Sequence, residues 1–173
     1  MGEAHFDGIQ PALCEVLQNQ IVDAEKGFRK IRMFRETHVG GVPEKMNPID
    51  AFGHVNHARY VELLEAARWQ YLEDNDLIAP IHHAEIFHVV TQVCIQYLHP
   101  AKMGDVLCVE TKIGGRSNRR FRVDQTAFVK GSGKQAIKAT VTNAFVDRQG
   151  RPKAINGTLL DLWPDLAGAE HRV

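Results

Sequence analysis

The residues best placed to do chemistry are a carboxylate and two histidines in one short segment. Asp50 lies in a Pro-containing loop, and His54 and His57 follow it closely. A carboxylate there can attack a carbonyl carbon or activate a water, while free backbone N–H groups at a following helix N-terminus can hold an oxyanion. Asp is also common in Asx turns. From spacing alone, Asp50 is therefore either a hydrolytic carboxylate or a turn residue.

The same two histidines form an H-x-x-H pair, which raises the question of a metal site. A metal needs at least a third ligand. The candidates His82, His83 and His88 are separated from the pair by a helix and a loop. We therefore expect no metal.

A helix must follow this segment, because apolar residues recur at helical spacing from about Asn56 to Asn75. Asn56 is a suitable N-cap residue. Glu65 on this helix has two interpretations. It could orient the loop that carries Asp50, or it could pair with Arg68 at i,i+3 on the helix surface.

After the helix the sequence changes to four segments rich in Val, Ile, Thr and Phe, separated by Gly- and Pro-containing turns. They are Phe87–Tyr97, Asp105–Ile113, Phe121–Lys130 and Ala136–Asp147. An extended region, Phe28–Met46, precedes the helix. This order predicts an α+β fold in which an antiparallel sheet of about five strands wraps around one long central helix.

The rest of the chain sets limits on function. Lys plus Arg and Asp plus Glu both number 21, so a net charge of zero argues against nucleic acid as a partner. The three cysteines are isolated, and no segment approaches the length of a membrane span. We expect a cytoplasmic protein with no membrane span. A further helix is predicted over Pro11–Lys26.

The run from Asp50 to Tyr60, with its D-x-x-G-H-V-N-H string, continues into Glu65-Ala66-Ala67-Arg68-Trp69. It resembles the signature of the 4-hydroxybenzoyl-CoA thioesterase family, and within it the bacterial long-chain acyl-CoA thioesterase branch. The resemblance covers roughly residues 42–152. It implies a hotdog fold that hydrolyses acyl-CoA to free acid and CoA. The domain limits we expect are an N-terminal extension over 1–40, a hotdog domain over 41–160 and a C-terminal tail over 161–173.

The resemblance also implies roles for individual residues. Asp50 would be the catalytic base or nucleophile, and His57 would supply a backbone N–H, and in some relatives a side chain, to the oxyanion. Supporting or substrate-binding positions would be Gly53, His54, Asn56, Tyr60 and Glu65. Gly53 could allow close approach of substrate or simply form a turn.

CoA phosphates call for basic residues, and the resemblance places CoA binding at Arg116, Ser117 and Arg119, often on the neighbouring subunit. The other interpretation of this cluster is a solvated hairpin. No cofactor is expected beyond the CoA of the substrate. The implied assembly is a homodimer or homotetramer with the site at the subunit interface.

Three alternatives remain open. A hotdog hydratase is disfavoured, because its G-D-x-N-P-[LIV]-H signature is absent. The acyl donor could instead be carried by an acyl carrier protein, as in fatty-acid or polyketide biosynthesis. The chain could also be a non-catalytic acyl-thioester binding protein, since a fold alone does not establish a function.

Overall fold

The computed structural model describes residues 33–38 and 49–169, with side chains from residue 49 onward. The helix predicted over Pro11–Lys26, and most of the extended region Phe28–Met46, lie outside the described residues. Within the described part, no helix is long and apolar enough to cross a membrane.

The sheet is antiparallel and follows the predicted strands closely. Its strands are β1 (Met33–His38), β2 (Phe87–Tyr97), β3 (Val106–Arg116), β4 (Arg120–Val129), β5 (Gln135–Val146) and the short β6 (Pro152–Lys153). The order is β1-β3-β4-β5-β2, with β6 paired to β5. Strands β3, β4 and β5 therefore form a meander, whereas β2 crosses to the far edge and pairs with β5.

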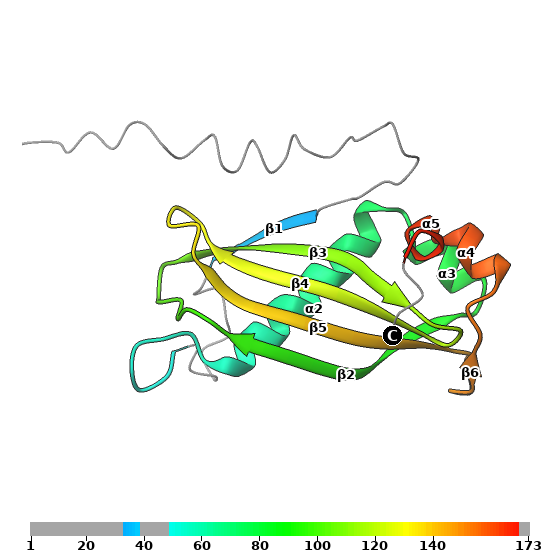
Figure 1. The fold of residues 1–173 in the computed structure, drawn as a ribbon, viewed down its shortest axis with the longest axis horizontal. Coiled ribbons are helices and arrows are strands. Elements are labelled where there is room, and N and C mark those ends of the chain that lie inside the picture. Colours follow the sequence, from blue (N-terminus) through cyan, green and yellow to red (C-terminus); the bar gives the residue numbers. More distant parts are fainter. Residues whose placement is uncertain (1–32, 39–48, 170–173) are drawn as a thin grey trace, which may run out of the picture.

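One long helix, α2 (His57–Asp74), runs diagonally across one face of this sheet (Figure 1). Asn56 is its N-cap, as the sequence predicts, and Asn75 is its C-cap. The buried face of α2 consists of Tyr60, Leu63, Leu64, Ala67, Tyr71 and Leu72. The predicted α+β hotdog architecture, a sheet wrapped around a central helix, is confirmed.

Short helices close the end of the sheet at which α2 terminates (Figure 1). They are α3 (Ile78–His83), α4 (Gly157–Leu162) and α5 (Pro164–Ala167). Trp163 and Leu166 are buried, and the Trp163 indole N–H donates to the Tyr71 hydroxyl at 3.2 Å. Part of the segment assigned to a C-terminal tail thus contributes to the core.

The core beneath α2 divides into two apolar clusters. One surrounds the first half of the helix, including Tyr60 and Leu64, and the other surrounds Tyr71 and the C-terminal Trp163. Inward-facing polar residues lie between them and beside the second cluster. Three polar side chains are classed as buried in the described part of the chain: Thr111, Gln125 and Asn143.

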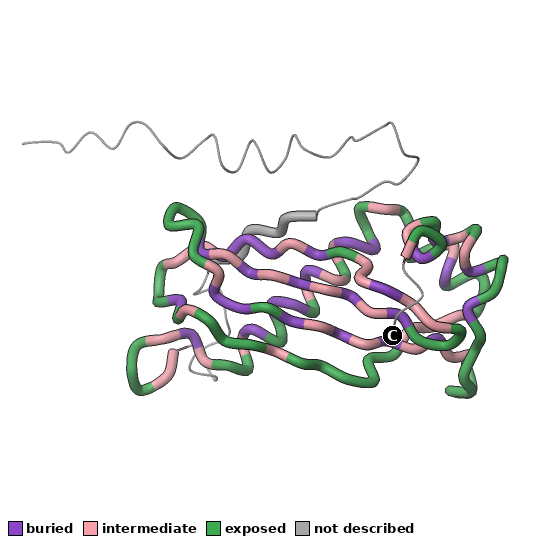
Figure 2. The backbone as a smooth tube through the Cα atoms, viewed as in Figure 1, coloured by how far each residue is buried: buried purple, intermediate pink, exposed green. Residues whose placement is uncertain are grey.

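The edge strand β2 differs from the rest of the sheet in its exposure. Figure 2 shows β2 as largely exposed, whereas β4 and most of β5 alternate between buried and intermediate residues. Such alternation is expected when one face packs on a core and the other faces outward. The exposed β2 side chains include several apolar ones.

Candidate functional site

The loop that carries Asp50 is a tight chain reversal. The Asp50 backbone N–H donates to the His54 carbonyl oxygen at 2.7 Å, and the Gly53 N–H donates to the Asp50 carbonyl at 3.1 Å. Gly53 has a φ of +77°, and no atom lies within 4 Å of where a Cβ would stand. Glycine is therefore favoured here by the left-handed backbone rather than by close packing.

The Asp50 carboxylate is held by backbone donors from its own loop. Its Oδ1 accepts hydrogen bonds from the N–H groups of Phe52 at 2.8 Å and His54 at 3.0 Å. The Asx turn considered for this residue is therefore present. Among the described residues, none donates to Oδ2. The His54 N–H is the main cause of a lowered Asp50 pKa, so the carboxylate is an anion at neutral pH and keeps one oxygen for chemistry.

The N-terminus of α2 follows this carboxylate directly. The Asn56 Oδ1 accepts from the Ala58 N–H at 3.3 Å. No described residue accepts from the His57 N–H, and the His57 side chain is exposed. A free N–H at the positive end of a helix is suited to an oxyanion. Among the described residues, no group of three or more His, Cys, Asp or Glu is arranged to hold a metal.

A buried tyrosine fastens the loop to the rest of the fold. The Val55 N–H donates to the Ala101 carbonyl at 2.8 Å, and the Ala101 N–H donates to the Tyr60 hydroxyl at 3.1 Å. Tyr60 is buried, so this contact supports the loop from beneath. His54 adds an isolated β-bridge to Lys102.

Tyr97 was not predicted to belong to the site. It lies at the end of β2, and its hydroxyl donates to the His57 carbonyl oxygen at 3.4 Å, while its ring meets that of Tyr60 edge-on. The pairing of β2 with β5 rather than β3 brings it there. Sequence reasoning had no signal for that crossover.

Glu65 is exposed, and its charge acts on Arg68 on the same helix. Burial lowers the Arg68 pKa, and Glu65 partly offsets that effect. Glu65 makes no hydrogen bond to the 49–55 loop within the described residues. The structure shows this electrostatic effect on Arg68, and the role of Glu65 stays a prediction.

The candidate CoA residues lie at the β3–β4 turn, at the other end of β3 from the Asp50 loop. The Arg116 Nε donates to the Leu166 carbonyl at 2.6 Å, and Ser117 closes the turn by donating its N–H to the Arg120 carbonyl at 2.8 Å. Arg119 is exposed. β3 spans about 35 Å at roughly 3.3 Å per residue. One chain therefore does not bring these residues to its own Asp50.

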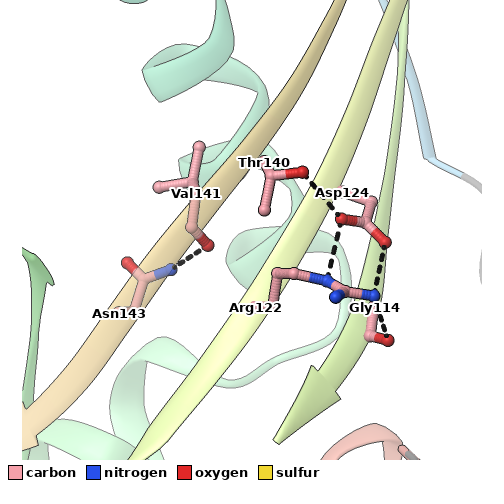
Figure 3. A network of polar contacts seen from close by, with 6 residues as sticks. All are labelled: Gly114, Arg122, Asp124, Thr140, Val141 and Asn143. Carbon is pink, nitrogen blue, oxygen red and sulfur yellow. Dashed lines mark hydrogen bonds and ion pairs between the residues drawn. The ribbon is translucent and has the colours of Figure 1, made fainter. Parts of the chain in front are cut away.

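Arg122, near the same turn, is engaged in polar contacts within the chain on the outward face of the sheet. Its guanidinium donates to the Gly114 carbonyl at 2.9 Å and pairs with Asp124, which also accepts from the Thr140 hydroxyl (Figure 3). A Cβ at Gly114 would stand 2.0 Å from the Asp124 Oδ2, so glycine makes room for this cluster. The cluster is structural and leaves Arg119 as the exposed candidate for phosphate.

Comparisons with known proteins bear on the family and the fold. Residues 45–166 match the model of the Thioesterase-like superfamily. The chain is 30% identical over 112 residues to the long-chain acyl-CoA thioesterase FadM of Escherichia coli strain K12, covering 64% of this chain and 85% of FadM. It is 32% identical over 100 residues to the acyl-CoA thioesterase YbgC of Haemophilus influenzae, covering 57% of this chain and 72% of YbgC. The solved structure of the probable thioesterase YbaW of E. coli superposes with a TM-score of 0.67 at 25% identity, covering 78% of this chain and 97% of YbaW.

Proposed function

Because the chain belongs to the Thioesterase-like superfamily, we propose that it is a thioester hydrolase that converts acyl-CoA to the free acid and CoA. The curated relatives FadM and YbgC are both named acyl-CoA thioesterases, which supports this substrate class. The observation that carries the proposal is the Asp50 carboxylate, held ionised by two backbone N–H groups in the loop that leads into the N-terminus of α2.

The chemistry assigned to Asp50 can take two routes. In one, its free Oδ2 attacks the thioester carbonyl, the C–S bond breaks to release CoA thiolate, and water hydrolyses the resulting anhydride. In the other, Asp50 removes a proton from water, which attacks the carbonyl and expels the same thiolate. Both routes need the carboxylate ionised, and both build negative charge on the carbonyl oxygen.

The N–H of His57 is the donor proposed for that oxygen. It lies at the first residue of α2, where the helix dipole is positive and the Asn56 side chain already caps Ala58. A donor fixed before the reaction stabilises the oxyanion without reorganisation. The exposed imidazole of His57 is available to the leaving thiolate or the substrate.

We further infer that two copies pair through β2. In the described part of the chain no strand covers the outer edge of β2, and Val89, Val90 and Val93 on this strand are exposed. A long, apolar free edge invites pairing with another strand. A symmetric pair would join the two β2 edges in an isologous interface.

Such a pair has a consequence for CoA. An antiparallel β2–β2 contact reverses the partner, so the partner's β3–β4 turn lies toward the end that carries the first subunit's Asp50. This arrangement would offer Arg119 of the second copy to the nucleotide phosphates. The same arrangement would also explain why Asp50 and Arg119 lie far apart within one chain.

The test is turnover of acyl-CoA esters from acetyl to palmitoyl, plus 4-hydroxybenzoyl-CoA, by the full chain, with released thiol as the readout. We expect turnover of at least one ester. Light scattering at the same concentration should give a mass of two or four chains. Turnover of carrier-protein thioesters only, or binding without hydrolysis of any ester, would contradict the proposal.

A further inference from the structure

A small pocket lies under the second half of α2. Its volume is about 20 Å³, and its lining includes Arg68, Tyr71, His88, Thr111, Asn143 and Trp163. That is room for one group the size of a water molecule or a hydroxyl. Most of its lining is apolar, so its few polar groups decide what it can hold.

Asn143 supplies an acceptor without a partner. Its side chain is 1% exposed, and its Nδ2 donates to the Val141 carbonyl oxygen at 3.1 Å (Figure 3). That bond fixes the amide, because a flipped amide would set its oxygen against the carbonyl. The Oδ1 is then buried with no donor among the described residues. A buried acceptor in this state favours any ligand that brings an O–H or N–H.

Arg68 supplies donors. Its Nη1 donates to the Gln125 Oε1 at 2.9 Å, and Gln125 is itself fixed by the Leu64 carbonyl and the Thr111 hydroxyl. The guanidinium has further N–H groups beyond this bond. His88 is mostly neutral near pH 7, since burial, followed by the charge of Arg68, lowers its pKa.

An uncovered apolar face leads from the candidate active site to this pocket. Four β2 residues stand opposite buried β5 residues: Tyr97 with Ile137, Ile95 with Ala139, Val93 with Val141 and Val90 with Asn143. Directly opposed residues project to the same side of a sheet, so these four face α2. Val90, Val93 and Tyr97 are nonetheless 46%, 41% and 52% exposed.

This apolar face has the candidate active site at one end and the pocket at the other. At one end the Tyr97 hydroxyl meets the His57 carbonyl. At the other end Val90 stands opposite Asn143, and both Asn143 and His88 line the pocket. From His57 to Arg68 the helix rises about 16 Å. An acyl group with a single aromatic ring is too short for this span, whereas an extended long aliphatic chain can follow it.

We propose that this pocket is a subsite for a hydroxyl group carried on the distal part of a long aliphatic acyl chain, and that Arg68 and Asn143 select for it. A hydroxyl can accept from Arg68 and donate to the Asn143 Oδ1 at once. A carboxylate is larger and would set its oxygens against that Oδ1. The inference rests on the proposed acyl-CoA hydrolysis and specifies its substrate class.

The experiment compares kcat/KM for palmitoyl-CoA with a series of hydroxypalmitoyl-CoA isomers whose hydroxyl moves along the distal half of the chain. The dicarboxylic analogue of equal length is included. We expect one isomer to exceed palmitoyl-CoA by about tenfold or more, as hydrogen bonds to a charged and an otherwise unsatisfied group allow. Isomers that all stay within about twofold of palmitoyl-CoA, or a preferred dicarboxylate, would overturn the subsite.

Variants then assign the preference to the pocket. Arg68→Met keeps the aliphatic stem and removes the donors, and Asn143→Leu removes the acceptor at similar size. For each variant, the ratio of kcat/KM for the preferred hydroxypalmitoyl-CoA to kcat/KM for palmitoyl-CoA should fall to about one. Thr142→Leu, on the opposite face of the same strand, is the matched control and should keep the wild-type ratio. A preference that survives both pocket variants would contradict the assignment.

The outcomes distinguish a failure of the proposed subsite from a failure of the proposed thioesterase activity. Turnover of palmitoyl-CoA without preference for any hydroxyl isomer removes the subsite and leaves the thioesterase. Failure to hydrolyse any CoA ester removes the thioesterase and the subsite with it. The wild-type comparison decides this even if a pocket variant does not fold.

Discussion

The hydroxyl of Tyr60 accepts a hydrogen bond from the backbone N–H of Ala101 at 3.1 Å, and this contact joins the central helix to the loop between β2 and β3. Ala101 is fully buried and in turn accepts from the Val55 N–H. The position of the Asp50 loop therefore depends on a side chain that belongs to the helix. That relationship makes the first prediction.

Tyr60→Phe should leave the buried Ala101 N–H without an acceptor. An unsatisfied buried donor costs about 1–3 kcal/mol, so the free energy of unfolding in urea should fall by that amount. The kcat/KM for acyl-CoA should fall as well, because the loop loses a support. Tyr97→Phe, which removes only a long contact at an exposed residue, is the control for stability. Equal stability of wild type and Tyr60→Phe would contradict the role given to this bond.

Gln125→Leu should destabilise the protein by about 2 kcal/mol, because it removes a buried amide bonded to the Leu64 carbonyl, the Thr111 hydroxyl and Arg68. Thermal unfolding would measure the loss. Thr126→Val, next to it on the outward face of β4, should change little. If both variants unfold at the same temperature as wild type, the buried network does not hold the helix to the sheet.

Gly53→Ala should cost about 1 kcal/mol, because the +77° φ of Gly53 is strained for any residue with a Cβ. No neighbour obstructs the added methyl group, so the cost is purely conformational. Gly157→Ala offers a matched control, since its Cβ also meets open space and its φ lies outside the left-handed region. Urea unfolding of the two variants side by side would check this, and equal costs would refute the conformational explanation.

The pH dependence of hydrolysis should follow the lowered pKa of Asp50. The carboxylate is needed ionised, so activity is present above its folded pKa and lost as pH falls through it. The His54 N–H is the main cause that holds this pKa below the ordinary value of an aspartate. The acid limb of kcat/KM should therefore lie at a lower pH than an ordinary aspartate would give, as far as the protein stays folded. An acid limb between pH 6 and 7 would instead point to a histidine.

The sequence predicted the helix and strands well because their signals are local. The helical period from Tyr60 to Leu72, the Asn56 cap and the Val-rich strands all depend on neighbouring residues. The crossover of β2 to the far edge is a non-local property, and Tyr97 was missed for that reason. Gln125 and Asn143 did leave a signal, as polar residues at inward positions of alternating strands. Their partners on α2 and β3 become visible only in three dimensions.

The candidate site was predictable to the same limited extent. The placement of Asp50 before a capped helix follows from its motif, while its two N–H donors depend on the left-handed turn at Gly53. The basic cluster was predicted as one unit, yet the fold divides it. Arg116 and Ser117 make contacts within the chain and Arg119 remains exposed. Backbone geometry and strand ends decide this, and neither can be read from spacing.

The central claim is that Asp50 carries the hydrolysis, and Asp50→Asn tests it most directly. Asn keeps an oxygen that can accept from Phe52 and His54, so the loop can survive while the charge is lost. Asp147 is a matched control, since its carboxylate likewise accepts two backbone N–H groups, from Gln149 and Arg151. The measurement is kcat/KM for the best acyl-CoA substrate. We predict a loss of about a hundredfold or more for Asp50→Asn and little change for Asp147→Asn. Near-wild-type activity of Asp50→Asn would contradict the account.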